Sequence, residues 1–389
     1  QLQAEKFDVM LVENFDMCGV AYSHLIKPKA LITTAASAPM SFMFQEFGIP
    51  TALSYNPSAF MYQMNVHSFI DRSKNIYADI MMHLLFYPGR WKVKRIANES
   101  NIISMIPIKE ISSHAAYTFI NTEPLIDFAA PTLNRVIPIG GIGAKTPQTL
   151  DQYWNDVLSH RSKTIIISFG SVVKCTNMPE DVRQSILTAI GSFPEVTFIW
   201  KYEEPEDEFG KAATVAHPNL VLTYWMPQND LLNDERISAF ITHGGMGSTQ
   251  ETALRGKPGI FIPIFGDQPR NAGMMHHNGL GKVIDKLDLQ KPEVVVVAIK
   301  EVLENDLYRE KAARVSAMLA KKPFTPKELL IKTVEFAAEF GPSRALRPQS
   351  YDMTFIAFHN LDIIAAFIAL SILKVFLLKK CVCCLFSKC

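Results

Sequence analysis

The 389-residue sequence predicts an α/β protein with two doubly wound, Rossmann-type domains, the first of them incomplete, followed by a transmembrane helix. Three observations support this prediction. Short apolar runs alternate with helical patterns along most of the chain, which is typical of parallel sheets covered by helices. A glycine-rich turn joins an apolar run at 237–242 to a helical pattern from Ser248. Residues 361–378 are almost continuously apolar.

The first part of the chain, residues 1–140, contains elements of one partial domain. We expect strands at residues 7–12, 30–33 and 51–54 and a helix at residues 81–100. Residues 137–144 contain several glycines and resemble a dinucleotide loop, but the third glycine of that motif is missing and no helix follows promptly. A domain linker is therefore the favoured interpretation, and the dinucleotide loop the alternative.

The second part, residues 141–345, alternates strands and helices more regularly. This alternation implies a parallel, doubly wound sheet. The expected strands are residues 164–169, 197–200, 220–222, 237–242, 259–263 and 282–284. The expected helices are residues 179–192, 248–255 and 268–277, followed by more than one helix within residues 291–321.

Composition excludes several classes of function. The net charge is +1, so no broad basic field for nucleic acid is expected. Of six cysteines, four stand at positions 381–389, and neither a disulfide framework nor a metal-ligand spacing is present. We therefore expect no metal and no cofactor.

The segment from Trp225 to Gln268 contains the most specific pattern in the chain. A strand, a glycine turn and a helix start together form an anion site, because the turn and the helix N-terminus present free N–H groups. In open α/β sheets, ligands bind at the carboxyl ends of the strands. The segment contains, in order, Trp-Met-Pro-Gln-Asn-Asp-Leu-Leu from Trp225, Thr-His-Gly-Gly-Met-Gly-Ser-Thr-Gln-Glu to Glu251, and Asp-Gln-Pro-Arg-Asn from Asp267.

These motifs resemble the signature of the UDP-glycosyltransferase family, and in particular its animal UDP-glucuronosyltransferase branch. The sequence from Met246 to Glu251 resembles that of invertebrate, nematode-like members of the family. The resemblance extends from about residue 5 to the C-terminus. It implies the GT-B fold, with an acceptor-binding domain at 1–140, a UDP-sugar-binding domain at 141–345, and a UDP-sugar and a small lipophilic acceptor as partners. A homo- or hetero-oligomer is possible.

The resemblance assigns roles to residues whose chemistry suits them. An aromatic face holds a planar base, so Trp225 would stack on uracil beside Met226. The amide of Gln228 and the carboxylate of Glu251 would bind the ribose. The diphosphate would contact a second set of residues at strand ends and in the glycine turn: Ser171, His243, Gly245, Gly247 and Ser248. The sugar hydroxyls would contact Asp267 and Gln268.

The departures from the family pattern concern catalysis. The family uses a histidine base oriented by an aspartate, and the histidine position is not in this sequence. Glu13 stands at the orienting position and is our catalytic candidate, although its side chain is one methylene longer than aspartate. His24 is a weaker alternative base. Gly247 stands where many relatives have asparagine, which leaves the backbone N–H but removes a side-chain contact.

The apolar run near the C-terminus predicts a membrane anchor. Eighteen residues at about 1.5 Å each span about 27 Å, close to the thickness of a bilayer core. Lys379 and Lys380 follow at once, so the tail at 379–389 is expected in the cytoplasm and the body in the lumen of the endoplasmic reticulum. A buried helix of a soluble domain is the alternative. In the lumen, Asn98 and Ser100 would form a glycosylation acceptor.

The sequence supports two alternative functions. The chain begins with Gln1, and the family has further residues ahead of this point, so we expect a fragment or a truncated gene product. Such a chain transfers glucuronic acid or glucose with inversion, or is a non-catalytic UDP-sugar-binding or dimerisation partner. A hydrolase is excluded because no G-x-S-x-G turn occurs. Arg270 is the candidate cation for a glucuronate carboxylate.

Overall fold

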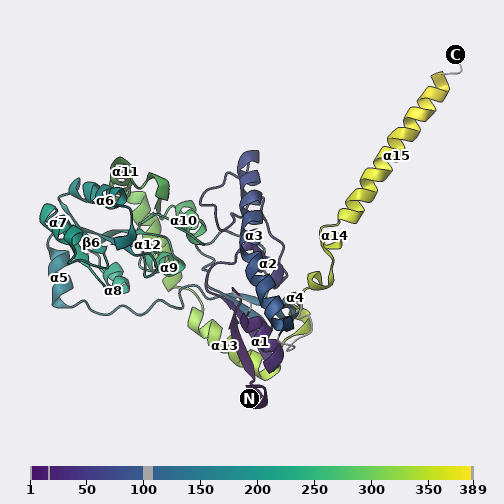
Figure 1. The fold of residues 1–389 in the computed structure, drawn as a ribbon, viewed down its shortest axis with the longest axis horizontal. Coiled ribbons are helices and arrows are strands. Elements are labelled where there is room, and N and C mark those ends of the chain that lie inside the picture. The colour runs from purple at the N-terminus through teal and green to yellow at the C-terminus, as the bar shows by residue number, and fades with distance from the viewer. Residues whose placement is uncertain (1, 16–17, 100–107, 387–389) are drawn as a thin grey trace. The chain divides into compact units, whose positions relative to one another are not determined.

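The computed structural model describes residues 2–15, 18–99 and 108–386, which form two compact units, Gln1–Ser343 and Arg344–Cys389 (Figure 1). The first unit contains two parallel sheets with helices around them. The second unit is dominated by one long helix.

The first sheet has four parallel strands in the order β1-β2-β3-β4. Its strands are β1 (Val9–Glu13), β2 (Ala30–Ala35), β3 (Tyr117–Ile120) and β4 (Val136–Pro138). The strands predicted at 7–12 and 30–33 are confirmed, whereas the strand predicted at 51–54 is wrong. The carbonyl oxygen of Ala52 accepts hydrogen bonds from the N–H groups of Tyr55 and Asn56, which closes a turn there.

The helices of this part include one that is much longer than predicted. They are η1 (Leu2–Glu5), α1 (Cys18–Ile26), α2 (Ser41–Phe47), α3 (Phe69–Glu99) and α4 (Ile108–Ser113). The N–H of Asp71 donates to the hydroxyl of Ser68 at 3.2 Å, which caps the first turn of α3. This serine, followed three residues later by a carboxylate, is the start signal that the prediction of residues 81–100 missed.

The second sheet has six parallel strands in the order β10-β9-β8-β5-β6-β7. Numbered along this part of the chain, that order is 3-2-1-4-5-6 read from β7, the doubly wound arrangement of dinucleotide-binding folds. The strands are β5 (Lys163–Ser168), β6 (Val196–Lys201), β7 (Leu220–Thr223), β8 (Ile237–Thr242), β9 (Gly259–Phe261) and β10 (Gly281–Val283). All six predicted strands are confirmed within two residues at each end.

Helices cover both faces of this sheet. They are α5 (Gln152–Ser159), α6 (Glu180–Gly191), α7 (Glu208–Ala216), α8 (Gln228–Asn233), α9 (Met246–Leu254), α10 (Gln268–His277), α11 (Pro292–Glu304) and α12 (Asp306–Ala320), with short 3-10 turns η2 (Cys175–Asn177) and η3 (Lys286–Asp288). Side chains on α6 and α11 pack on one face against Ile165 and Ile167. The other face carries Ile166, which packs with residues of α5 and α8.

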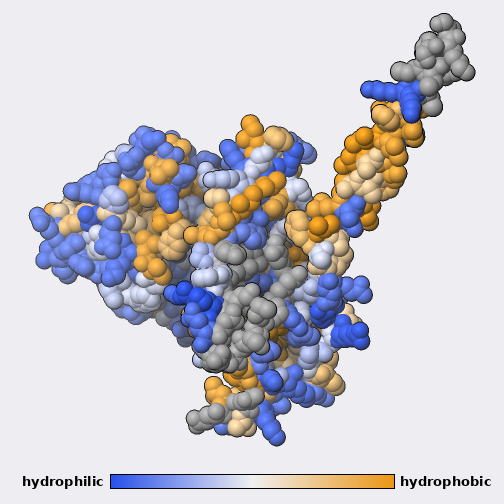
Figure 2. All heavy atoms as spheres, turned by 45° about the vertical axis from the view of Figure 1, so that its right-hand side comes forward, coloured by the Kyte–Doolittle hydropathy of each residue, from blue (hydrophilic) through white to orange (hydrophobic). Residues whose placement is uncertain are grey.

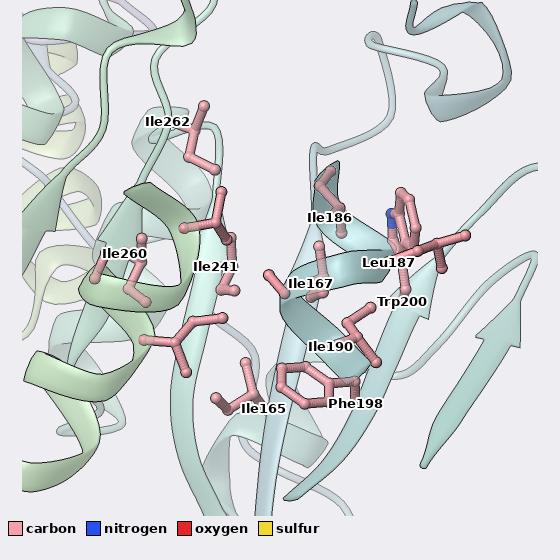
Figure 3. Close-up of a cluster of buried hydrophobic side chains, with 14 of the residues drawn as sticks. Ile165, Ile167, Ile186, Leu187, Ile190, Phe198, Trp200, Ile241, Ile260 and Ile262 are labelled. Atoms are coloured by element: carbon pink, nitrogen blue, oxygen red, sulfur yellow. The ribbon is translucent and has the colours of Figure 1, made fainter. Parts of the chain in front are cut away.

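The core of the second sheet explains why its strands read as apolar runs. Successive strand residues point to opposite faces, and both faces are covered, so apolar residues predominate and polar ones such as Thr164, Thr197 and Ser238 stand near the strand ends. Figure 3 shows one of the two layers, in which Ile167 of β5 lies beside Ile186 and Ile190 of α6, and Ile241 and Ile260 extend the same cluster across β8 and β9. This rigid layer holds the carboxyl ends of β5 and β8 in place.

The helix α13 (Pro326–Phe340) returns to the first sheet. It follows the second sheet in sequence, yet Ala337 packs against Ala30, Ile32 and Phe119 of the first sheet. A capping box at Thr325 and Glu328 defines its start. The two sheets of this unit are therefore linked twice, by the segment after β4 and by the segment before α13.

The second unit contains η4 (Arg344–Leu346), η5 (Gln349–Asp352), α14 (Phe355–Phe358) and α15 (Leu361–Phe386). The segment Leu361–Lys380 of α15 is long and apolar enough to cross a membrane, and none of its most apolar stretch is buried. Figure 2 shows the hydrophobic surface along this helix. Length and composition are thus those of a membrane span, as predicted for residues 361–378.

Candidate functional site

The candidate site lies at the switch point of the second sheet, between β5 and β8, where successive strands are added on opposite sides. β5 and β8 are neighbours, and their last residues, Ser168 and Thr242, are paired. The chain continues from β5 toward β6 on one side and from β8 toward β9 on the other. The loops after these two strands therefore separate, and a crevice opens at this edge of the sheet.

His243 follows β8 directly and lies between two glycines. A Cβ built at Gly170 would lie 2.7 Å from Cε1 of His243, and a Cβ built at Gly245 would lie 2.5 Å from Nε2. Gly170 and Gly244 have φ of +82° and +78°, a conformation that favours glycine. The imidazole is thus enclosed by backbone that only glycine permits. Burial lowers the pKa of His243, and a backbone hydrogen bond involving Ser168 opposes that shift, so the neutral ring is favoured.

The helix α9 starts at the glycine turn. Gly245 is the residue before its first turn, so Met246, Gly247 and Ser248 all lie within that turn. The prediction placed the start at Ser248, two residues too late. The N–H groups of a first helical turn have no partner within the helix, and here they lie next to His243. This turn has the geometry of an anion site.

Gln228 and Glu251 form a polar pair on the same side of the sheet. The amide Nε2 of Gln228 donates to Oε2 of Glu251 at 2.6 Å and lies 3.5 Å from the hydroxyl of Ser248. Burial raises the pKa of Glu251, while the hydrogen bond from Gln228 and the charge of Arg255 oppose that shift. The pair presents donors and acceptors side by side, which suits a diol such as ribose.

Trp225 provides an aromatic face next to this pair. Its side chain is 64% exposed, which is unusual for tryptophan and leaves the ring available for stacking. Lys201, at the end of β6, holds its ammonium 5.7 Å from the ring centroid and pairs with Glu203 at 3.0 Å. The neighbouring Met226 is buried. The indole is therefore supported from one side by a cation.

A cavity of about 690 Å³ joins these features. Of the predicted site residues, its lining contains Ser171, Trp225, Met226, Gln228, Ser248 and Glu251. The prediction missed Lys201, and the loop from Gly143 to Gln148 that forms another part of the wall. The rule that ligands lie at strand ends would have found Lys201, because the predicted strand at 197–200 ends just before it.

His243 and the glycines Gly245 and Gly247 are not part of this lining. Gly170 lines the cavity and lies against the imidazole of His243, so it separates His243 from the cavity. Gly247 has no heavy atom within 4 Å of a built Cβ, so this position has room for a side chain. Of the predicted phosphate residues, Ser171 and Ser248 therefore line the cavity, whereas His243, Gly245 and Gly247 do not.

Asp267 and Gln268 lie at the start of α10 and are also outside the cavity lining. Asn271 donates to Oδ2 of Asp267 at 2.9 Å, and burial raises the pKa of that carboxyl. The side-chain oxygen of Gln268 accepts from the N–H groups of Ile264 and Phe265 at 2.8 and 3.0 Å. This oxygen therefore braces the loop between β9 and α10, while the sugar contact stays a prediction.

Arg270, the predicted partner of a glucuronate carboxylate, forms a buried ion pair within the protein. The sequence makes it the candidate cation for a glucuronate carboxylate, but its Nη2 lies 2.7 Å from Oδ1 of Asp127, and both side chains are buried. The guanidinium also lies over the ring of Phe128. Arg270 is thus already paired with a carboxylate that is distant in sequence.

The catalytic candidate Glu13 lies at the carboxyl end of β1. Its side chain is exposed, and Oε2 accepts from the hydroxyl of Thr34 at 3.3 Å. His24 lies on α1 and is exposed. Ser100, the last residue of the predicted glycosylation acceptor, lies outside the described residues, as do residues 387–389 of the predicted tail.

Comparisons with known proteins agree with this geometry. The model of a family described as "UDP-glucoronosyl and UDP-glucosyl transferase" matches residues 1–389. The putative UDP-glucuronosyltransferase ugt-48 of Caenorhabditis elegans is 30% identical over 371 residues, which cover 94% of this chain and 69% of that protein. Human UDP-glucuronosyltransferase 1A9 is 28% identical over 394 residues, which cover 100% of this chain and 71% of the human protein.

A solved structure is similar in fold. The glycotransferase of kitacinnamycin aligns with a TM-score of 0.58 at 16% identity, covering 84% of this chain and 76% of the other. The parallel sheets and this likeness confirm the predicted GT-B fold.

Proposed function

Because the chain belongs to the UDP-glycosyltransferase family and is a glycosyltransferase, we propose that it transfers glucuronic acid or glucose from a UDP-sugar to a small lipophilic acceptor, with inversion. The single observation that carries the proposal is the cavity beside the switch point of the second sheet, where Trp225 and the pair Gln228–Glu251 lie on one wall. An aromatic face, a diol-binding pair and a helix N-terminus are what base, ribose and diphosphate require.

In this proposal each part of UDP has its own set of residues. Uracil stacks on Trp225 and the ribose hydroxyls bind Gln228 and Glu251. The diphosphate lies at Ser171, Ser248 and the first turn of α9. His243 is held by its glycines where it can donate one N–H to a phosphate oxygen. A neutral imidazole, which burial favours here, has a single N–H, and the backbone hydrogen bond involving Ser168 already engages the ring, so donation to the phosphate would replace that bond or follow protonation of the ring.

The reaction follows from these positions. An acceptor oxygen forms a bond to the anomeric carbon while the bond from that carbon to the diphosphate breaks, and the acceptor proton passes to the histidine base that the family uses, whose position is not in this sequence. The negative charge that develops on the diphosphate is stabilised by His243 and the helix N-terminus. Removal of one such donor typically costs about 3–4 kcal/mol of transition-state stabilisation. Glu13 is proposed to orient the base rather than to act on the substrate.

The location is also a proposal. The apolar helix α15 would anchor the protein in the endoplasmic reticulum membrane, with the body in the lumen and residues 379–389 in the cytoplasm. Residues 1–140 would bind the acceptor and residues 141–345 the UDP-sugar.

Thermal unfolding of the full chain in detergent tests the proposal. UDP at about 100 times its Kd should stabilise the protein by about 2.7 kcal/mol through mass action. Trp225→Ala should remove most of this stabilisation. Tyr224→Ala is the matched control, because the two neighbours are similarly exposed, at 65% and 64%, and only Trp225 lines the cavity.

A transfer assay with radiolabelled UDP-sugar then follows the chemistry. His243→Ala should reduce both UDP binding and transfer. If UDP leaves the unfolding temperature unchanged, and His243→Ala and Trp225→Ala behave like the unsubstituted chain, the proposed function is wrong.

A further inference from the structure

A second cavity of about 800 Å³, which we name the α12–α13 groove, lies apart from the first. The two cavities share no lining residue. The lining of the groove comes from the C-terminal half of α12, residues 322–324, the first part of α13, the loop after β3 and the end of β4. The groove therefore lies outside the site proposed for UDP, where the chain passes from the second sheet back to the first.

Apolar side chains form most of the α12–α13 groove. They are Leu125, Pro138, Ala317, Met318, Phe324 and Leu329. Leu125, Met318 and Phe324 are 37%, 40% and 52% exposed, although side chains of this kind are usually buried. Large apolar residues that gather on a surface mark a binding site, and the volume is in the range of cavities that hold small organic molecules.

One face of α12 supplies an apolar stripe with a cation at each end. Arg314, Ala317, Met318 and Lys321 follow one another at intervals of three or four residues, so they lie on the same face of the helix. At about 1.5 Å per residue, Arg314 and Lys321 are roughly 10 Å apart along the axis. A ligand that lies along this stripe would therefore have its apolar part on Ala317 and Met318 and its end next to a positive charge.

The two cations of the stripe are free to bind a ligand. Within the part of the chain that the structure describes, neither the guanidinium of Arg314 nor the ammonium of Lys321 has a hydrogen bond or an ion pair. Lys322, by contrast, is paired with Glu123 at 2.6 Å. Glu123 is the one carboxylate in the lining, and it also accepts from the N–H of Leu125 at 3.1 Å. The lining thus keeps two unpaired positive charges.

The charges just outside the lining do not cancel this balance. The ammonium of Lys332 lies 5.9 Å from the ring centroid of Phe324. Glu328 is held in the capping box, where it accepts from the N–H and the hydroxyl of Thr325 at 2.9 and 2.8 Å. The positive charge of Lys332 also lowers the pKa of Glu328, so these two groups offset each other. The groove therefore remains cationic.

From this geometry we infer that the α12–α13 groove binds a long-chain carboxylate, such as a fatty acid. The acyl chain is removed from water on the apolar stripe, and the carboxylate forms charge-assisted hydrogen bonds with Arg314 or Lys321. The two cations stand at opposite ends of the stripe rather than in a cluster, so a head group meets one of them at a time, which suits a single negative charge. This site is additional to the proposed function and does not depend on it.

Photo-crosslinking of the full chain in phospholipid nanodiscs tests the inference. The probe is palmitic acid with a diazirine in its chain, and mass spectrometry of the peptides locates the label. We expect labelling within residues 314–329 that excess palmitic acid suppresses and excess hexadecanol does not. Labelling by probe dissolved in the bilayer does not saturate and serves as the reference. If residues 314–329 carry no saturable label, or if hexadecanol competes as well as palmitic acid, the inference is overturned.

Removal of the two cations tests the role of the head group. Arg314→Gln combined with Lys321→Gln should lower the saturable labelling roughly ten-fold, because hydrogen bonds to a charged group are lost. Lys300→Gln combined with Lys327→Gln is the matched control, since it removes the same charge from exposed positions outside the groove. The control should be labelled like the unsubstituted chain. An equal loss in both variants would show that overall charge attracts the probe, and would overturn the inference.

Ala317→Trp tests the apolar stripe without a change in charge. Ala317 is exposed and lines the groove, so a larger side chain fills the groove without entering the core. We expect it to abolish the saturable labelling. Undiminished labelling would overturn the inference. Calorimetry with UDP on the same samples tests the proposed function separately, because no lining residue of the UDP cavity has been changed.

Discussion

Gly245→Ala tests whether the glycine turn holds His243 in place. A Cβ at residue 245 would lie 2.5 Å from Nε2 and 3.0 Å from Cε1 of the imidazole. Real Cβ contacts essentially never fall below 3.0 Å, so the ring has to move. The backbone at Gly170 also lies against the ring, where a Cβ would be 2.7 Å from Cε1. The ring therefore has little room to yield toward Gly170.

The magnitude follows from what the displaced ring loses. Inserting a methyl group into a filled space typically costs about 1–3 kcal/mol. A ring that moves away from the diphosphate also loses a hydrogen bond to a charged group, worth about 1.5–3 kcal/mol. We therefore expect UDP affinity to fall roughly 10- to 150-fold. The unfolding free energy should fall as well, because the strain is present without ligand.

Gly247→Ala is the matched control, two residues further along. A Cβ there meets no heavy atom within 4 Å, and the residue lies in the first turn of α9. Alanine should leave UDP affinity unchanged and raise stability by up to about 1 kcal/mol, because glycine is a poor helix former. Calorimetry with UDP and urea unfolding measure both quantities. Equal UDP affinity and equal stability in the two variants would refute the role of the glycine turn.

Three further predictions concern other parts of the molecule. Burial lowers the pKa of His243 below 6.5, so the unfolded chain binds more protons than the folded chain below that pH, and the contribution of His243 to the free energy of unfolding is complete above pH 6.5 and is lost as pH falls toward the folded pKa. Urea unfolding should therefore show a decrease in the free energy of unfolding from pH 7.5 to 5.5 that is smaller in His243→Gln. The same decrease in both proteins would contradict this prediction. Gln228→Ala leaves the buried carboxyl of Glu251 without its donor and should cost about 1–3 kcal/mol of UDP binding by calorimetry, whereas unchanged affinity would exclude the ribose role. Leu370→Arg, in the middle of α15, should disfavour membrane insertion by about 2.5–3.5 kcal/mol and move the protein from the carbonate-resistant membrane pellet to the supernatant. The control variant Leu287→Arg, at an exposed position outside α15, should stay in the pellet. If both variants pellet equally, α15 does not span the membrane.

The longer strands of the second sheet could be predicted because most of their positions are apolar. Helices cover both faces, so β5 and β8 each contain a run of apolar residues, Ile165–Ile167 and Ala239–Ile241. The strands β3 and β4 were not predicted, although β7, β9 and β10 are equally short and were. Residues 51–54 have strand-like composition, but local hydrogen bonds to Ala52 form a turn instead.

Part of the candidate site could be predicted from the sequence, and part could not. Placement at strand ends predicted Ser171, His243 and Asp267 as site residues, and of these Ser171 lines the cavity. Applied to the residue just after the predicted strand at 197–200, the same rule would have included Lys201, which lines the cavity. The partner of Arg270 could not be predicted, because Asp127 follows a strand of the other sheet and nothing local links the two.

The sequence by itself determined the order of the elements, the glycine turn at His243 and the apolar helix at the C-terminus, because these depend on local composition and periodicity. Only the tertiary structure decided which side chains share the cavity wall and which charges neutralise each other. Hydrogen bonds such as that from Gln228 to Glu251, and ion pairs such as Asp127–Arg270, form between groups that the sheets bring together. Their effect depends on distance and burial, which periodicity does not encode.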